Sequence, residues 1–439
     1  MRHGRYGNAQ RRNSSISSNI AVPSFLKVVS YILQSLALKP SLKASNLQAM
    51  RKHKPDYLVV MIVGVLLVLG LIVIYAVSPA LSYRLLGDYS ENYFLYKQLM
   101  NIGIGVVGFI VASKMPIHIW KRLLPLMILA CVISLILLFI PGIAVSQNGA
   151  TRWIDIGILS FQPAELFKLT TLFYLAFFLG EKTDDELQNP YHTLVPVGII
   201  LAIIGFIVVV LQRDMGTMMT LVAIIIGMFY LADVSLKQFF IMIAALVAGA
   251  VASIVLFPHR IERLFTFLNP GSDVEGTGYH VHQALIAIGS GGLIGLGLGR
   301  SVQVYGYLPE AANDSIFAIW AEKFGFIGSL AVLGLFSALL YRLYLVTSQS
   351  QNRSTKLVAG GVLLWISSHV VINVGSMLGI MPLTGITLPF LSYGGSSLLF
   401  MLIALGVVLQ LSRYTERPKS QLSRNINSYT KFNNARGRI

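Results

Sequence analysis

Residues 57–79, YLVVMIVGVLLVLGLIVIYAVSP, form one unbroken apolar run without a charged side chain. About 20 such residues in a helix cross the roughly 30 Å hydrocarbon layer of a bilayer. Backbone polar groups cannot be left unpaired in lipid, so a run of this kind must pair them within a helix. The stretch therefore predicts a membrane-spanning helix, and it sets the pattern for the rest of the chain.

Nine further apolar runs follow the first one. They cover residues 95–113, 121–140, 163–180, 192–211, 214–232, 236–257, 315–346, 355–380 and 385–411. Charged residues make up only 12% of the 439 residues, about half of the roughly 25% usual in soluble domains. The sequence predicts one all-α, polytopic membrane domain of ten transmembrane helices over residues 57–412, without an internal repeat.

Lys and Arg are distributed unequally between the two sides of this bundle. Most of the 34 lie in the N-terminal tail (1–56), in the C-terminal tail (413–439) and in the loops on the same side. The positive-inside rule makes both termini cytoplasmic, and an even number of spans agrees. The net charge of +16 is expected to meet anionic membrane lipids, and it does not indicate nucleic-acid binding.

The loop between the seventh and eighth spans, residues 258–314, is external in this topology. Its end lies within the phrase LPEAANDSIFAI (308–319), which places the carboxylate of Asp314 at the start of a membrane helix. This position suits chemistry on an amphiphilic substrate, but either Asn313 or Asp314 could instead cap the eighth helix. Glu310 is a second carboxylate of the same loop.

Charged residues also occur inside the predicted spans. Glu165 and Lys168 lie three apart in QPAELFKL, on one helix face, and Asp214 follows Arg213 in QRDMGT. Charges at membrane depth are costly and are candidates for function. Two interpretations stay open: a structural ion pair, of Lys168 with Glu165 or with Asp214, or binding of a phosphate-bearing substrate by Lys168.

Two glycine-rich segments interrupt the helical pattern on the external side. The first (289–299) lacks the spacing of a dinucleotide site. The second, PLTGITLPFLSYGGSS (382–397), contains prolines and glycines that prevent a straight helix. Irregular backbone at membrane depth is tolerated where protein covers it or where it lines a wet cavity. We therefore expect an outer cavity, with the hydroxyls of Ser396 and Ser397 on its wall.

The pair of His280 and His282 in GYHVHQ has no third ligand nearby, so the sequence does not predict a metal site.

Taken together, these phrases resemble the SEDS family (shape, elongation, division and sporulation), bacterial membrane proteins that polymerise peptidoglycan. The resemblance covers about residues 57–412 and rests on phrases that occur in order along the chain. They are GATRWIDIG (149–157), QPAELFKL (162–169), RDMGT (213–217), RIERLFTFLNP (260–270), GTGYHVHQALIAIGSGGLIGLGLG (276–299), LPEAANDSIFAIWAEKFGFIG (308–328) and PFLSYGGSSLL (389–399). The phrase SVQVYGYLPEA and the long basic N-terminal tail resemble the division branch of the family more than its elongation branch.

The resemblance implies a fold related to GT-C glycosyltransferases, lipid II as substrate, and a catalytic aspartate that matches Asp314. Two departures stand out. The family phrase close to HTDFIFA reads ANDSIFA here, and Arg213 stands where proline is common. The implied reaction is attack of a sugar 4-hydroxyl on the anomeric carbon of the growing chain, with release of polyprenyl diphosphate. Asp314 would accept the proton, or it would hold a divalent cation such as Mg²⁺ or Mn²⁺.

The diphosphate that leaves requires cationic stabilisation. The candidates are Arg152, Lys168, Arg213, Arg260, Arg263 and Arg300.

The resemblance also implies partners and a place in the cell. The partners are the nascent glycan strand, a class B penicillin-binding protein that crosslinks it, other division proteins and membrane lipids. The place is the inner membrane of a bacterium, at the division septum. Two other functions remain as alternatives: a lipid II flippase, and an inactive scaffold for a partner synthase.

Overall fold

The computed structural model describes residues 53–86, 91–147, 150–155, 160–255 and 277–415, together with residues 157, 261, 265 and 267. Most of the two predicted tails and most of the loop before residue 277 therefore lie outside the described residues. Arg260 and Arg263 are among the residues left out.

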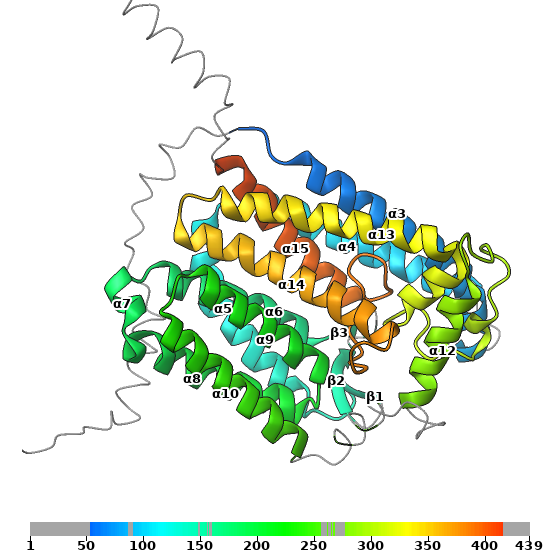
Figure 1. Ribbon diagram of the computed structural model, residues 1–439, viewed down its shortest axis with the longest axis horizontal. Coiled ribbons are helices and arrows are strands. Elements are labelled where there is room, and N and C mark those ends of the chain that lie inside the picture. The colour runs from blue at the N-terminus through cyan, green and yellow to red at the C-terminus, as the bar shows by residue number, and fades with distance from the viewer. Residues whose placement is uncertain are drawn as a thin grey trace, which may run out of the picture. The chain divides into compact units, whose positions relative to one another are not determined.

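Long helices dominate the described chain (Figure 1). They are α3 (Tyr57–Leu86), α4 (Tyr93–Lys114), α5 (Ile117–Leu137), α6 (Pro163–Gly180), α8 (Pro190–Phe206), α9 (Met215–Leu231), α10 (Leu236–Val255), α13 (Ile316–Ser348), α14 (Arg353–Met377) and α15 (Gly395–Leu411). Within the described residues, nine helices are long and apolar enough to cross a membrane, and α9, with 17 residues, is a shorter apolar helix. The prediction of a polytopic all-α membrane protein is confirmed.

The predicted bounds need correction at three places. The tenth run, 385–411, is helical only from Gly395, because the prolines and glycines before it hold the chain in an irregular path. The first helix continues through Pro79 to Leu86. The fifth run ends in a π-helical turn, Ile207–Leu211, so its last residues are not α-helical.

The core of the bundle lies around α6, α14 and α15. In their most apolar segments, 83%, 78% and 83% of the residues are buried, against 17% in α4 and α10. Close helix contact is possible because of glycine: a Cβ at Gly406 of α15 would lie 2.5 Å from the carbonyl oxygen of Phe109 in α4. Helix α6, which carries both Glu165 and Lys168, is therefore central.

A small antiparallel sheet at one end of the bundle was not predicted. Its strands are β1 (Ala144–Gln147), β2 (Ala150–Asp155) and β3 (Ser160–Phe161), in the order β1-β2-β3. Helix α12 (Thr277–Ser290) and the irregular segment that precedes α15 lie at the same end (Figure 1). We call this the sheet end.

The short helix α7 (Asp184–Gln188) marks the opposite end (Figure 1). Several basic residues form ion pairs at this α7 end. The pairs are Lys121–Glu181, Arg342–Asp56, Arg353–Asp184 and Lys356–Asp233. Each of these cations belongs to the side that the Lys and Arg distribution predicts to be cytoplasmic.

Candidate active site

Asp314 lies in a turn that precedes α13 at the sheet end. The N-cap residue of α13 is Ser315, and it makes no side-chain cap bond. The hydroxyl of Ser315 instead donates to the carbonyl oxygen of Pro309 at 2.8 Å. The amide of Asn313 donates to the carboxylate of Glu310. The N-cap position therefore belongs to Ser315, and not to Asn313 or Asp314.

The Asp314 carboxylate is buried and only partly satisfied. Asp314 is only 8% exposed. Its buried Oδ1 has no hydrogen-bond partner among the described residues. Burial, followed by the negative charge of nearby Glu310, raises the pKa of Asp314 to about 7. The group is thus poised to gain or lose a proton near neutral pH.

The irregular segment before α15, residues 382–394, packs directly against this turn. Asn373 of α14 donates through Nδ2 to the carbonyl oxygens of both Asp314 and Ile386, at 2.7 Å each. The backbone N–H of Tyr393 donates to the carbonyl oxygen of Ala312 at 2.8 Å. A Cβ on Gly385 would lie 3.9 Å from Oδ2 of Asp314. The 382–394 segment and the Asp314 turn therefore form one structural unit.

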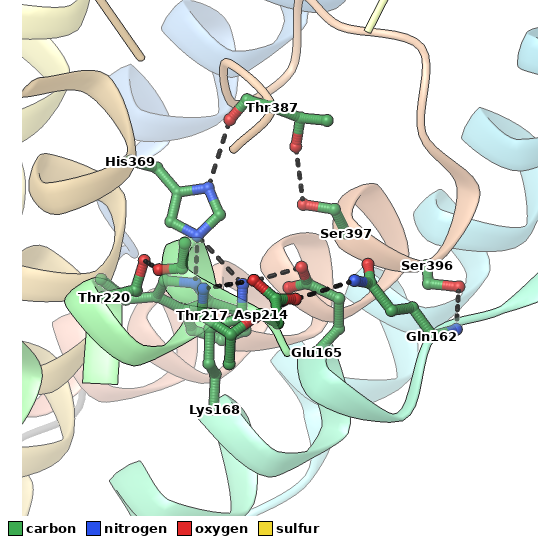
Figure 2. Close-up of polar contacts among 12 residues, drawn as sticks. Gln162, Glu165, Lys168, Asp214, Thr217, Thr220, His369, Thr387, Ser396 and Ser397 are labelled. Carbon is green, nitrogen blue, oxygen red and sulfur yellow. Dashed lines mark hydrogen bonds and ion pairs between the residues drawn. The ribbon is translucent and has the colours of Figure 1, made fainter. Parts of the chain in front are cut away.

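The start of α9 lies on another side of the 382–394 segment. A Cβ on Gly216 would lie 2.7 Å from the carbonyl oxygen of Thr384, so glycine permits this close approach. Asp214 is the N-cap of α9, and it accepts from the backbone N–H and the hydroxyl of Thr217 at 2.9 Å each (Figure 2). In this structure Asp214 stabilises the helix start.

Arg152 and Arg213 have different surroundings. Arg152, on β2, donates through Nε to the carbonyl oxygen of Gln212 at 3.0 Å and through Nη2 to that of Arg213 at 2.7 Å. This holds Arg213 in a left-handed backbone conformation, with φ of 51°. The side chain of Arg213 is exposed and forms no ion pair within the described part of the chain. Of the two, Arg213 is the cation available to an anion.

Glu165 and Lys168 form the predicted buried ion pair. Nζ of Lys168 lies 2.7 Å from Oε1 of Glu165, and the two residues are 2% and 4% exposed. The same ammonium lies 3.1 Å from Nε2 of His369 and 5.7 Å from the ring centre of Trp365. Figure 2 shows Glu165, Lys168 and His369 close together below Thr387.

Ser396 and Ser397 are buried, and protein groups use their hydroxyls. Ser396 Oγ accepts from the backbone N–H of Gln162 and donates to the carbonyl oxygen of Ser160, at 3.0 Å each. Ser397 Oγ accepts from the hydroxyl of Thr387 at 3.3 Å. Both hydroxyls thus bond to protein groups that neighbour α15. The sequence predicts them on the exposed wall of a cavity, and the structure does not place them there.

His369 and Asn373 were missed by the sequence reasoning, although a signal was present. Both are polar residues inside the ninth apolar run, and such residues are functional candidates by default. Their spacing of four places them on one face of α14, together with Trp365, which lies four residues earlier.

His280 of α12 also contacts the Asp314 turn. Its Nε2 lies 2.6 Å from the hydroxyl of Ser315, and burial lowers the pKa of His280 to about 4. Among the described residues, no group of three His, Cys, Asp or Glu side chains could hold a metal ion. Asp314 supplies a single carboxylate, which does not by itself make a protein-built metal site.

These features define a class: a polytopic membrane protein with a poised carboxylate and buried charges near one end of its bundle. The chain belongs to the cell cycle protein family of FtsW, RodA and SpoVE, which matches residues 56–417. This confirms the resemblance to the SEDS family, and the relatives named FtsW support the division branch.

Two curated relatives are similar over most of their length. Stage V sporulation protein E of Bacillus subtilis is 38% identical over 83% of this chain and 99% of its own. The probable peptidoglycan glycosyltransferase FtsW of Coxiella burnetii is 37% identical over 80% of this chain and 94% of its own.

Solved structures agree with this fold. A chain of a peptidoglycan synthase complex that coordinates polymerization and crosslinking has a TM-score of 0.65, with 26% identity over 82% of this chain and 98% of its own. The rod shape determining protein RodA of Thermus thermophilus has a TM-score of 0.59, with 26% identity over 82% of this chain and 98% of its own.

Proposed function

We propose that Asp314 is the general base with which this FtsW-type peptidoglycan glycosyltransferase polymerises lipid II. The observation that carries the proposal is the buried Oδ1 of Asp314, which has no partner among the described residues. A buried polar atom without a partner costs free energy, and a substrate hydroxyl would satisfy it. The pKa of about 7 also suits a group that must accept a proton near neutral pH.

In the proposed step, the 4-hydroxyl oxygen of one lipid-linked sugar forms a bond to the anomeric carbon of the growing chain. Its proton passes to the Asp314 carboxylate. The bond from the anomeric carbon to the diphosphate oxygen breaks, and polyprenyl diphosphate leaves with the electron pair. The configuration at the carbon inverts, which gives a β-1,4 link. Exposed Arg213 is the cation we assign to the leaving diphosphate.

The other candidate residues support this chemistry from a distance. We infer that Glu165, Lys168, Arg152 and Asp214 hold the framework around the substrate, because each bonds to protein groups at the sheet end. Ser396 and Ser397 do the same for the start of α15. Glu310 acts through its charge, which helps to raise the pKa of Asp314.

We also infer the cellular setting from the relatives. One structural neighbour acts in a complex that combines polymerization with crosslinking, so the partner we propose is a crosslinking enzyme, a class B penicillin-binding protein. Several relatives are named FtsW, which supports division, at the septum of the bacterial inner membrane. Asp314 would then face outward, and both termini would be cytoplasmic.

The direct test is polymerisation of labelled lipid II by the purified protein in the presence of its crosslinking partner. Asp314→Asn should reduce the rate by about 10³-fold, within the range for loss of a general base, while the protein stays folded. Asp155→Asn, which changes an exposed carboxylate of β2, is the matched control and should retain the wild-type rate. Wild-type polymerisation by Asp314→Asn would overturn the assignment.

The same preparation separates the alternatives. Reconstituted protein that moves lipid II across vesicles without forming polymer would support a flippase. Protein that stimulates its partner equally well with Asp314 or Asn at position 314 would support a scaffold.

A further inference from the structure

One face of α14 points toward the 382–394 segment. Trp365, His369 and Asn373 follow one another at intervals of four residues, which stacks them along a single helix face. All three are almost fully buried, with exposures of 0%, 1% and 2%. Polar groups in a membrane bundle are costly unless they are paired, so the partners of His369 and Asn373 indicate what this face does.

The groups around His369 determine where its proton lies. Nζ of Lys168 and Nε1 of Trp365 each lie 3.1 Å from Nε2 of His369. An ammonium and an indole N–H can only donate, so Nε2 must accept. The proton of the neutral imidazole is then on Nδ1, which donates to the carbonyl oxygen of Thr387 at 3.2 Å. Figure 2 shows the ring between Lys168 and Thr387.

One helical turn further along α14, Asn373 makes the adjoining attachment. Its Nδ2 donates to the carbonyl oxygen of Ile386 and to that of Asp314, at 2.7 Å each. His369 and Asn373 therefore hold two successive carbonyl groups of the 382–394 segment. Through Asn373, the same attachment reaches the backbone of Asp314.

We propose that His369 is a positioning residue for glycosyl transfer. It connects the buried Lys168 ammonium to the carbonyl group of Thr387 and so keeps the 382–394 segment seated against Asp314. This inference rests on the proposed role of Asp314 as the base. His369 acts only through the segment, and loss of its bonds would let the segment move. A misplacement of about 1 Å can reduce a rate by about 10²-fold.

Two variants at this position separate its hydrogen bonds from its bulk. His369→Gln keeps one donor and one acceptor on the side chain, so it can bond to both Thr387 and Lys168. His369→Leu keeps bulk but removes both functions. We expect His369→Leu to lower kcat by about 10²-fold with little change in KM, and His369→Gln to restore kcat to within about threefold of wild type.

A second measurement reports on the segment without using activity. Hydrogen exchange of the peptide covering residues 383–394 should become faster in His369→Leu and stay at the wild-type rate in His369→Gln. Ser368→Ala is the matched control, because Ser368 is a buried neighbour on α14 whose hydroxyl donates only to the carbonyl oxygen of Trp365 in the same helix. It should change neither kcat nor exchange.

If His369→Leu does not fold, Trp365→Phe replaces it, since this change keeps an aromatic ring and removes one donor to Nε2. It should lower kcat several-fold and speed exchange of the same peptide. Wild-type exchange and kcat in the folded variant would overturn the inference. Failure of the wild-type protein to polymerise lipid II, with exchange in 383–394 still dependent on His369, would overturn the proposed function and leave His369 only its structural part, the holding of the 382–394 segment.

Discussion

The two irregular segments at the sheet end are held in opposite ways. Residues 291–297 bond to the kinked part of α13 through backbone groups: Leu296 N–H to Glu322 O, Gly297 N–H to Lys323 O, Phe326 N–H to Gly292 O, and Ile327 N–H to Leu293 O, at 2.9 to 3.1 Å. The 382–394 segment depends mainly on side chains, above all His369 and Asn373. Both segments are rich in glycine or proline, yet the sequence pattern alone does not distinguish them.

This difference indicates that residues 291–297 belong to the structural framework and that the 382–394 segment belongs to the site. A segment held by backbone hydrogen bonds, which we call a backbone clamp, does not depend on the identity of most side chains. It requires glycine where a Cβ would overlap the facing backbone, as at Gly291 and Gly295. A segment held by side chains instead depends on a few donors and acceptors, and here it adjoins the buried carboxylate of Asp314. We therefore expect substitutions in residues 291–297 to act on folding, and substitutions around residues 382–394 to act on activity as well.

The largest effect is expected at Gly295, in the backbone clamp. Gly295 has φ of +85°, and a Cβ there would overlap the carbonyl group of Lys323. Gly295→Ala should cost about 5 kcal/mol, because it adds left-handed strain of about 1–2 kcal/mol and breaks several backbone bonds worth about 1 kcal/mol each. The measurement is the amount of monodisperse protein recovered from membranes. Gly297→Ala is the control, because Gly297 has the same left-handed backbone conformation, with φ of +86°, but its Cβ would meet open space. Equal yields of the two variants would contradict the clamp.

Lys168 should have the next largest effect, and it lies beneath the 382–394 segment. Lys168→Met leaves the buried Glu165 carboxylate without its counter-ion, and breaking a buried pair costs about 3–5 kcal/mol. Lys168→Arg should lose less because it keeps the charge. Thermal midpoints in detergent and lipid II binding measure the two roles separately. A stable Lys168→Met protein that fails only in lipid II binding would show that the ammonium contacts substrate directly.

Much of the fold could be predicted because apolar length is a local property. Every predicted span contains a helix, and Pro163 begins α6 as expected for a first helical residue. The three short strands were missed because two- to six-residue segments carry too little pattern to identify. The apolar side chains of the tenth run extended it to residue 385, although the prolines and glycines of residues 382–397 predicted an irregular segment there. The structure confirms the irregular segment, since α15 begins only at Gly395.

The site was only partly predictable for a related reason. The phrase around Asp314 identified the carboxylate, and the spacing of Glu165 and Lys168 identified their ion pair. The bonds of His369 to Lys168 and Thr387 join three parts of the chain that are distant in sequence. A local sequence pattern cannot predict such a tertiary contact. Ser396 and Ser397 show the converse, since hydroxyls that looked suited to substrate are bonded to protein.

The buried Asp314 carboxylate should lower the stability of the folded protein when it is ionised. Its pKa is about 7 in the folded protein, against an ordinary value of 3.8, so the folded state binds more protons than the unfolded state between these pH values. Stability therefore falls as pH rises from about 4 to 7. Asp314→Asn removes this loss, so it should be more stable than wild type by about 4 kcal/mol at pH 8, since the rise in pKa from 3.8 to about 7 is worth roughly 1.4 kcal/mol for each pKa unit.

The gap between Asp314→Asn and wild type should narrow as the pH is lowered toward 5. Thermal midpoints at pH 5, 6.5 and 8 measure it, and a gap that does not change with pH would mean that Asp314 is not a titrating buried group. Polymerisation by wild type should rise with pH through about 7, because the base must be deprotonated.

The smallest effect is expected at His280, which joins α12 to the Asp314 turn through one hydrogen bond to Ser315. His280→Leu should cost about 1 kcal/mol at pH 7.5, the usual net value of one such bond.

The pKa of His280 is about 4 when folded, against 6.5 ordinarily, so the unfolded state binds more protons between these values. Wild type therefore loses stability as pH falls from about 6.5 toward 4, and the leucine variant does not. The difference in thermal midpoint should shrink or reverse at pH 5, and His282→Leu, which changes the exposed partner of the pair, is the control. A constant difference at both pH values would mean that burial does not lower the pKa of His280 in the folded protein.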